Sequence, residues 1–192
     1  SQLYSSVLHQ GVSVEVVQES ADLPGFALVL VPFMRHVSPT LLAKLKAFTE
    51  QHGKLIIGPM TGDRTSELAW PATNGLGIVG EWLGIHRVRQ YSEHNNQYIV
   101  QSVRGPVRLD GLLTVFDAPA GWETIIQAPN GQSIFAQGQV NQTTVLVMGA
   151  EPQTITDNSW WRRFVNTEIV PYDRDRQYLT LSAGLVKYRR DE

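Results

Sequence analysis

The fold is decided by GFALVLVPFMRHVSPTLLAKLKAFTEQHGKLIIGPMTG, residues 25–62. Continuous apolar runs over 26–32 and 54–58 predict two strands that are covered on both faces. Between them, Ser38 and Pro39 open a helix as its cap and its first helical residue, and Gly53 is expected to end it. A strand, a helix and a second strand in this order form the repeating unit of a parallel α/β sheet.

The flanking segments extend this pattern. Upstream, residues 3–9 are expected to end a helix and residues 12–17 to form a strand. Downstream, a long polar connection over 59–77 leads into a short helix over 77–85, and long connections in compact domains are often functional. The pattern then changes to strands at 97–103, 112–116, 122–128, 133–139 and 143–149, with a hairpin turn at Pro129-Asn130-Gly131. Residues 156–169 predict a closing helix, and 177–188 one more strand or an arm.

These elements predict an α/β fold of the Rossmann-like kind. We expect a mostly parallel sheet with flanking helices and an antiparallel β edge from 97 to 149. We divide the chain into a main domain over 1–151 and a closing helix with a C-terminal strand or arm over 152–192. A doubly wound sheet usually begins with a strand, whereas this chain begins in or just before a helix. Either another part of the chain supplies the missing strand or the chain is excised from a longer protein, and we expect excision.

Composition narrows the function classes. The 192 residues are 42% hydrophobic and 18% charged, with a net charge of −2, so no nucleic-acid partner is expected. The sequence has no cysteine, which excludes disulfides, thiolate metal sites and a cysteine nucleophile. We predict no membrane partner, because no apolar run is long enough to span a bilayer. We predict a cytoplasmic protein, because no signal-peptide pattern opens the sequence and the lack of cysteine fits a reducing compartment. No cofactor and no metal are predicted.

Reactive constellations are scarce in this sequence. Retaining glycosidases need two carboxyls about 5 Å apart, and none of the glutamates weighed for such a pair falls at a strand end. A hydrolase nucleophile is also missing, since Ser38 is interpreted as a helix cap and Thr61 is the other hydroxyl near a strand end. The histidines are dispersed. The glutamates weighed are Glu67, Glu81, Glu93, Glu123 and Glu151, and the histidines are His36, His52, His86 and His94.

Two nucleotide- or phosphate-related interpretations are weak as well. Gly75, Gly77 and Gly80 imitate a phosphate-binding spacing, but they follow a loop instead of a strand and are interpreted as a flexible loop before a short helix. A receiver domain needs an aspartate at the end of its central strand, where this chain has Val31 and Pro32. No catalytic residue is therefore predicted.

Aromatic residues give the better signal. Trp70 stands in a polar loop, where an apolar ring needs a partner surface. Trp160 and Trp161 are adjacent on a predicted helix and point about 100° apart, so both are not expected to face one core. The second ring is then either exposed for a subunit contact or covered by the C-terminal tail, and the sequence does not favour one over the other. The candidate interface or site-lining residues are Met60, Thr61, Asp63, Arg64, Trp70, Trp160 and Trp161.

The order of segments resembles the middle, trimerisation domain of family-42 β-galactosidases, within the glutamine-amidotransferase-like superfamily. The resemblance rests on LYSSVLHQGVSVEVV (3–17), on residues 21–63 and on the segment ending GIVGEWLGIHRV (77–88), and it covers about two-thirds of the chain. It implies that residues 1–151 are a class I amidotransferase-like domain. The catalytic glutamates of that family lie in a preceding barrel, so none is carried over to this chain.

The resemblance implies a non-catalytic scaffold that packs against other domains of a longer parent chain and against identical subunits, as a trimer, and helps to wall the active site of the assembled enzyme. The alternative is an independent small hydrolase or ligand-binding protein of amidotransferase-like fold that uses the loop 59–77 as its pocket.

Overall fold

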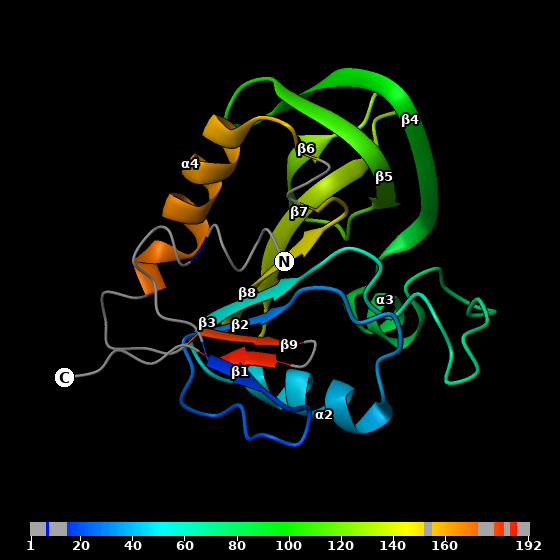
Figure 1. Cartoon of the computed structure of the whole chain (residues 1–192). Coiled ribbons are helices and arrows are strands. Elements are labelled where there is room, and N and C mark those ends of the chain that lie inside the picture. The colour runs from blue at the N-terminus through cyan, green and yellow to red at the C-terminus, as the bar shows by residue number, and fades with distance from the viewer. Residues whose placement is uncertain (1–6, 8–14, 152–154, 173–178, 183–184, 188–192) are drawn as a thin grey trace.

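The computed structural model describes residues 7, 15–151, 155–172, 179–182 and 185–187. Figure 1 shows how their elements are arranged. In chain order they are β1 (Glu15–Val17), β2 (Leu28–Val31), α2 (Pro39–Phe48), β3 (Gly53–Ile57), α3 (Gly77–Leu83), β4 (His86–Ser102), β5 (Val107–Asp117), β6 (Glu123–Gln127), β7 (Ser133–Val140), β8 (Thr143–Met148), α4 (Asn158–Glu168), the 3₁₀ helix η1 (Val170–Tyr172), β9 (Leu179–Ser182) and β10 (Leu185–Lys187).

The strands form one mixed sheet in the order β1-β10-β9-β2-β3-β8-β7-β5-β4-β6. Among the described strands, parallel pairing is confined to β1–β9, β9–β2, β2–β3 and β3–β8, and the remaining pairings are antiparallel. The α/β class is confirmed, but the expectation of a mostly parallel sheet is wrong. The strand–helix–strand unit of residues 25–62 makes only its own two strands parallel. The longer strands after it are joined by short turns and pair as antiparallel hairpins.

The predicted antiparallel edge is a closed ring. Strand β6 pairs with both β4 and β7, and β5 also pairs with both of them. These four strands therefore form a closed ring. In Figure 1, β4 and β5 arch over β6 and β7 at one end of the molecule. The β4 strand begins at His86, well before the predicted residue 97, and its register with β5 shifts between Glu93 and Tyr98. Such irregularities bend a strand and help a small sheet to close.

Helices cover both faces of the sheet (Figure 1). Side chains of β2 and β3 alternate between two apolar clusters, as successive residues of a strand must. Val29 and Leu55 pack toward α2 and α3, while Leu30 and Ile56 pack toward α4. The strands are therefore covered on both sides, which explains their continuous apolar sequence.

The helix α2 begins as the sequence predicts. The Ser38 hydroxyl accepts a hydrogen bond from the Leu41 amide at 3.0 Å, and Pro39 is the first helical residue. Its end differs, because the helix stops at Phe48 and Gly53 already belongs to β3. A Cβ at Gly53 would lie 2.8 Å from the Ala27 carbonyl oxygen. This glycine therefore allows two segments of the backbone to approach closely, and it does not end the helix.

Several other predicted elements are present in the structure. The short helix, the hairpin turn before β7 and the closing helix α4 are confirmed, and α4 is capped by Asp157. Most of residues 3–9 and 12–14 lie outside the described residues, although Val7 is helical and buried. The C-terminal segment contributes β9, which pairs in parallel with β2, so the strand beside β2 comes from late in the sequence.

Gly149 lies at the junction between the parallel strands and the ring. Its amide donates to the Ile134 carbonyl, and its own carbonyl accepts from the Thr114 amide, each at 2.7 Å. A Cβ at this position would lie 1.9 Å from the Thr114 carbonyl oxygen. The chain can therefore pass from β8 between β5 and β7 only where no side chain is present.

Candidate functional site

The candidate site lies where β2 and β3 end at the same edge of the sheet. The two loops that follow these strands are joined by main-chain bonds: the Gly62 amide donates to the Met34 carbonyl and the Arg64 amide to the Arg35 carbonyl, both at 2.8 Å. Inside this pairing, the Thr61 side chain is buried and its hydroxyl accepts from the Met34 amide at 3.4 Å. The loop after β3 is therefore a fixed platform.

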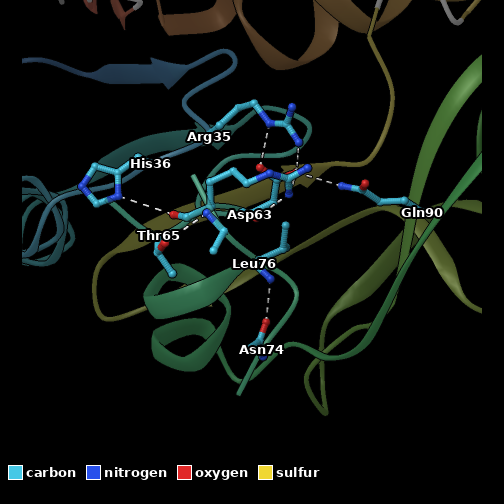
Figure 2. A network of polar contacts seen from close by, with 9 residues as sticks. Arg35, His36, Asp63, Thr65, Asn74, Leu76 and Gln90 are labelled. Carbon is cyan, nitrogen blue, oxygen red and sulfur yellow. Dashed lines mark hydrogen bonds and ion pairs between the residues drawn. The ribbon is translucent and has the colours of Figure 1, made fainter. Parts of the chain in front are cut away.

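Asp63 is the centre of this platform, and its side chain is fully buried. Arg35 binds it in a fork, with Nε donating to Oδ1 and Nη2 to Oδ2, each at 2.9 Å. Gln90 donates to Oδ2 at 3.0 Å, and Nη1 of Arg64 lies 3.2 Å from the same oxygen. Figure 2 shows Arg35 and Gln90 converging on Asp63 from different elements. Buried charges are stable in proteins when they are paired in this way.

The electrostatics follow from these contacts. The hydrogen bond from Arg35 to the Asp63 carboxylate raises the pKa of Arg35, so this guanidinium keeps its charge at any working pH. Both carboxylate oxygens of Asp63 already accept hydrogen bonds from charged or amide donors. A carboxylate held in this manner is a structural group and a poor general base.

Arg64 links the buried aspartate to the exposed part of the loop. Its Nη1 donates to the main-chain oxygen of Asp63 at 2.7 Å, and its Cζ lies 3.9 Å from the centre of the Trp70 ring. This distance is well within the range of a cation–π contact. The indole of Trp70 is nevertheless 55% exposed. Arg64 thus holds Trp70 in place at the surface.

The remainder of the loop is fixed by local bonds. The Leu68 amide donates to the Thr65 carbonyl at 3.0 Å, the Thr65 amide donates to the Ala69 carbonyl, and His36 Nδ1 lies 3.4 Å from the Arg64 carbonyl oxygen. Farther along, Asn74 accepts from the Leu76 amide (Figure 2) and donates to the Ile85 carbonyl. The flexible loop that was expected before α3 is therefore bound to the helix through Asn74.

The structure brings together five of the predicted residues, which are Met60, Thr61, Asp63, Arg64 and Trp70. Sequence reasoning missed Arg35 and Gln90. Arg35 had a signal, because it follows a strand that ends at the same edge as the one before Asp63. Gln90 had none, since it lies in the part of β4 that the strand pattern did not reveal.

Trp160 and Trp161 lie elsewhere, on α4. The expectation that the two rings cannot share one core is wrong, because both are buried in the same apolar cluster. Each stacks on Phe164, and Trp160 also meets Phe135 edge to face with centroids 5.9 Å apart. Large rings reach around the helix surface toward a common neighbour, which the 100° rule for Cα–Cβ directions does not capture. Within the described residues, neither indole is exposed for a subunit contact.

A second group of buried charges lies between α4 and the sheet, and the sequence analysis did not single it out. The two carboxylate oxygens of Glu168 contact Lys54 Nζ and Arg104 Nη2. Burial, with a smaller contribution from Arg104, lowers the pKa of Lys54 to about 7. The Arg104 guanidinium also lies 5.6 Å from the Phe164 ring centre, and burial lowers its pKa. This cluster joins β3, the β4–β5 turn and α4.

The described residues lack two further kinds of feature. No group of three or more histidine, aspartate or glutamate side chains there could hold a metal ion. No helix there is long and apolar enough to cross a membrane.

Fold and site together define a class: an α/β domain whose charged side chains pair with one another at the edge of the sheet. The sequence model of the β-galactosidase trimerisation domain matches residues 1–110, which is more than half of the chain. The chain therefore belongs to the family of β-galactosidase trimerisation domains, and the family-42 resemblance is confirmed.

Curated relatives agree with this assignment. The chain is 26% identical over 152 residues to the β-galactosidase YesZ of Bacillus subtilis, covering 78% of this chain and 23% of the relative. It is 30% identical over 132 residues to the β-galactosidase BgaA of a Thermus species, covering 66% of this chain and 18% of the relative. The chain thus spans less than a quarter of the length of these relatives.

Solved structures share the fold. Gan42B, a family-42 β-galactosidase from G. stearothermophilus, superposes with a TM-score of 0.76 at 16% identity over 90% of this chain and 25% of that protein. A cold-adapted β-galactosidase from Rahnella sp. R3 gives 0.75 at 16% identity over 91% of this chain and 27% of that protein. At these identities the likeness shows the fold alone.

Proposed function

We propose that this chain is the non-catalytic oligomerisation domain of a longer β-galactosidase, in which it packs against other domains and against identical subunits in a trimer. The observation that carries the proposal is the trimerisation-domain match over residues 1–110. The small share of each relative that the chain covers supports a parent protein about three and a half times as long. The catalytic step would then belong to the rest of that parent.

The loop 59–77 is the part of the domain that would contact a neighbour and help to wall the active site of the assembled enzyme. The Asp63 contacts support this role, because they hold the loop rigid without help from outside. Trp70 supports it as well, since its exposed ring is already oriented by Arg64. Preorganised aromatic side chains lose little entropy when a partner binds.

The finer structural relationship is part of the same proposal. A glutamine-amidotransferase-like, Rossmann-like origin is supported by the parallel β2–β3–β8 core and by helices on both faces. Residues 1–151 would form the trimerisation domain, and residues 152–192 would close it through α4 and β9. The cytoplasmic location suggested by the lack of cysteine stays a prediction.

The geometry argues against the alternative, in which the chain is an independent hydrolase with its pocket in this loop. Asp63 is occupied by its donors, Thr61 points into the fold, and the Ser38 hydroxyl caps α2. A hydrolase needs a nucleophile within hydrogen-bond reach of a base, and these groups are engaged in structural bonds.

The test compares the protein encoded by the complete reading frame with the 192-residue chain, using a chromogenic β-galactoside and mass in solution. We expect the complete protein to be a trimer that turns the substrate over, and the folded chain alone to show no turnover. Circular dichroism confirms that the isolated chain is folded. Turnover by the isolated chain, or a complete protein that stays monomeric, would contradict the proposal.

A further inference from the structure

Exposed apolar side chains gather on the loops at the site edge of the sheet. Leu68 is 71% exposed, Trp70 is 55% exposed, and Phe33, in the loop that follows β2, is exposed as well. Large apolar residues that remain in water contribute nothing to the stability of this chain. Exposed apolar side chains that gather on one edge are typical of surfaces that a partner covers.

Leu68 carries a further signal in its backbone. Its φ angle is +62°, in the left-handed region that glycine adopts easily and a leucine only under strain. The turn itself needs no leucine, since its bonds run between the main chain and Thr65. A strained residue whose side chain faces water points to a role for that side chain outside the chain.

The polar neighbours define the chemistry of the partner. Among its contacts with described residues, Arg35 uses Nε and Nη2 on Asp63, which leaves Nη1 to donate elsewhere, and the guanidinium is partly exposed. Glu67 is the exposed carboxylate on the loop, next to Leu68. A partner would therefore supply an acceptor oxygen to Arg35 and an apolar recess for Leu68 and Trp70.

We propose that Leu68 and Trp70, with the Arg64 that orients Trp70 and the free edge of Arg35, form the hot spot of the contact with a second copy of the full-length protein. Tryptophan and arginine are the residues most enriched at such hot spots. A stable interface needs about 800 Å² on each partner, more than this group supplies. The rest of that area would come from the part of the parent that lies outside this chain. This inference rests on the proposed function.

A second exposed apolar set, on the β4–β5 hairpin, is the natural control. It consists of Ile99, 60% exposed, with Val103 and Leu112. Ile99 is paired regularly with Arg108 in the ladder, and none of these three apolar residues has a positive φ. Single apolar residues on an outward sheet face are ordinary, so we expect no hot spot there.

The experiment uses the full-length protein and measures the subunit dissociation constant by sedimentation over a dilution series. Leu68→Gly and Trp70→Ala are each expected to raise it at least tenfold, whereas Ile99→Ser should change it less than threefold. Trp70→Phe, which keeps a ring over Arg64, should restore most of the affinity. Leu68→Gly should leave the thermal midpoint of the dissociated subunit within 1–2 °C of wild type, because glycine suits this φ.

The outcomes separate this inference from the proposed function. A wild-type protein that is monomeric would overturn both. A wild-type trimer whose loop variants assemble normally would overturn the hot spot alone, and the loop would then cover another domain of its own chain. Dissociation by Ile99→Ser instead would move the contact to the hairpin. A Leu68→Gly variant that unfolds would also count against the inference, since the side chain would then serve the fold.

Discussion

Two buried carboxylates in this domain are each paired with two cations, yet they serve different purposes. Asp63 binds Arg35 and Arg64, which belong to loops at the edge of the sheet, and the Arg35 side chain is 38% exposed. Glu168 binds Lys54 and Arg104, which come from β3 and the β4–β5 turn, and the Lys54 side chain is only 4% exposed. The first arrangement shapes a surface, and the second holds three distant segments together.

The difference in exposure between the two clusters helps to distinguish a surface site from a buried structural cluster when both consist of paired charges. Arg35, which binds Asp63 in a fork, has a route to water if Asp63 is removed, because its side chain is already partly exposed. Lys54 has no such route. The energetic consequences of breaking the two clusters should therefore differ, and the predictions below test that difference.

The largest effect is expected for Glu168→Ala. Below pH 7, where the folded chain keeps the Lys54 proton, this change leaves Lys54 and Arg104 as like charges without their counterion, which in buried sites costs about 3–5 kcal/mol. The measurement is the free energy of unfolding from chemical denaturation. Lys54→Met is the matched control, because it removes the buried cation and leaves the Glu168–Arg104 pair, and it should cost less than about 1 kcal/mol. Equal losses for the two variants would show that the cluster does not act as a charge pair.

Asp63→Ala should have the next largest effect, about 1–3 kcal/mol, because Gln90 loses its acceptor while Arg35 can turn to water. Asp63→Asn keeps one acceptor oxygen and is expected to lose roughly half as much. Denaturant unfolding measures both values. A loss as large as that of Glu168→Ala would remove the distinction between the two clusters.

A pH series sharpens the comparison further. The folded pKa of Lys54 is lowered to about 7 from 10.5, so between these values the unfolded chain binds a proton that the folded chain lacks. Stability should therefore rise with pH through this window, by up to about 1.4 kcal/mol per pH unit. Lys54→Met should flatten the rise, and an unchanged slope in that variant would assign the pH dependence to another group.

The smallest effect is expected for Trp70→Ala, about 0.5–1 kcal/mol, which is the usual value of an exposed cation–π contact. Trp70→Phe keeps a ring above Arg64 and should lie closer to wild type. Thermal unfolding of the dissociated subunit measures both. A loss above about 2 kcal/mol would mean that Trp70 belongs to the core of the fold, contrary to its role as a surface residue.

The sequence revealed the parts of the fold whose signals are local. The apolar runs of β2 and β3, the cap at Ser38 and the turn before β7 all depend on neighbouring residues, and each is present. The closure of β4 onto β6 and the parallel pairing of β9 with β2 were not predictable in this way. Those pairings join residues far apart in the chain, and apolar periodicity carries no information about partners.

The candidate site followed the same rule. Five predicted residues are found together because the long polar loop already contained them. Gln90 was invisible, since a polar residue on a strand has no distinguishing pattern. The two tryptophans of α4 were misjudged because the reach of an indole exceeds the offset between adjacent helical positions. Glu168 was overlooked because an isolated glutamate near a helix end looks like any solvated one.

Gly149 adds a mechanical consequence. The passage from β8 into the ring has no free volume, and its amide and carbonyl are bonded to strands on either side. We therefore expect the two ends of the sheet to move together, so that a rotation of the loops after β2 and β3 would also turn the β4–β5 arch. A neighbour that binds one end of this domain would then also fix the orientation of the other end, because the domain would move as one rigid body.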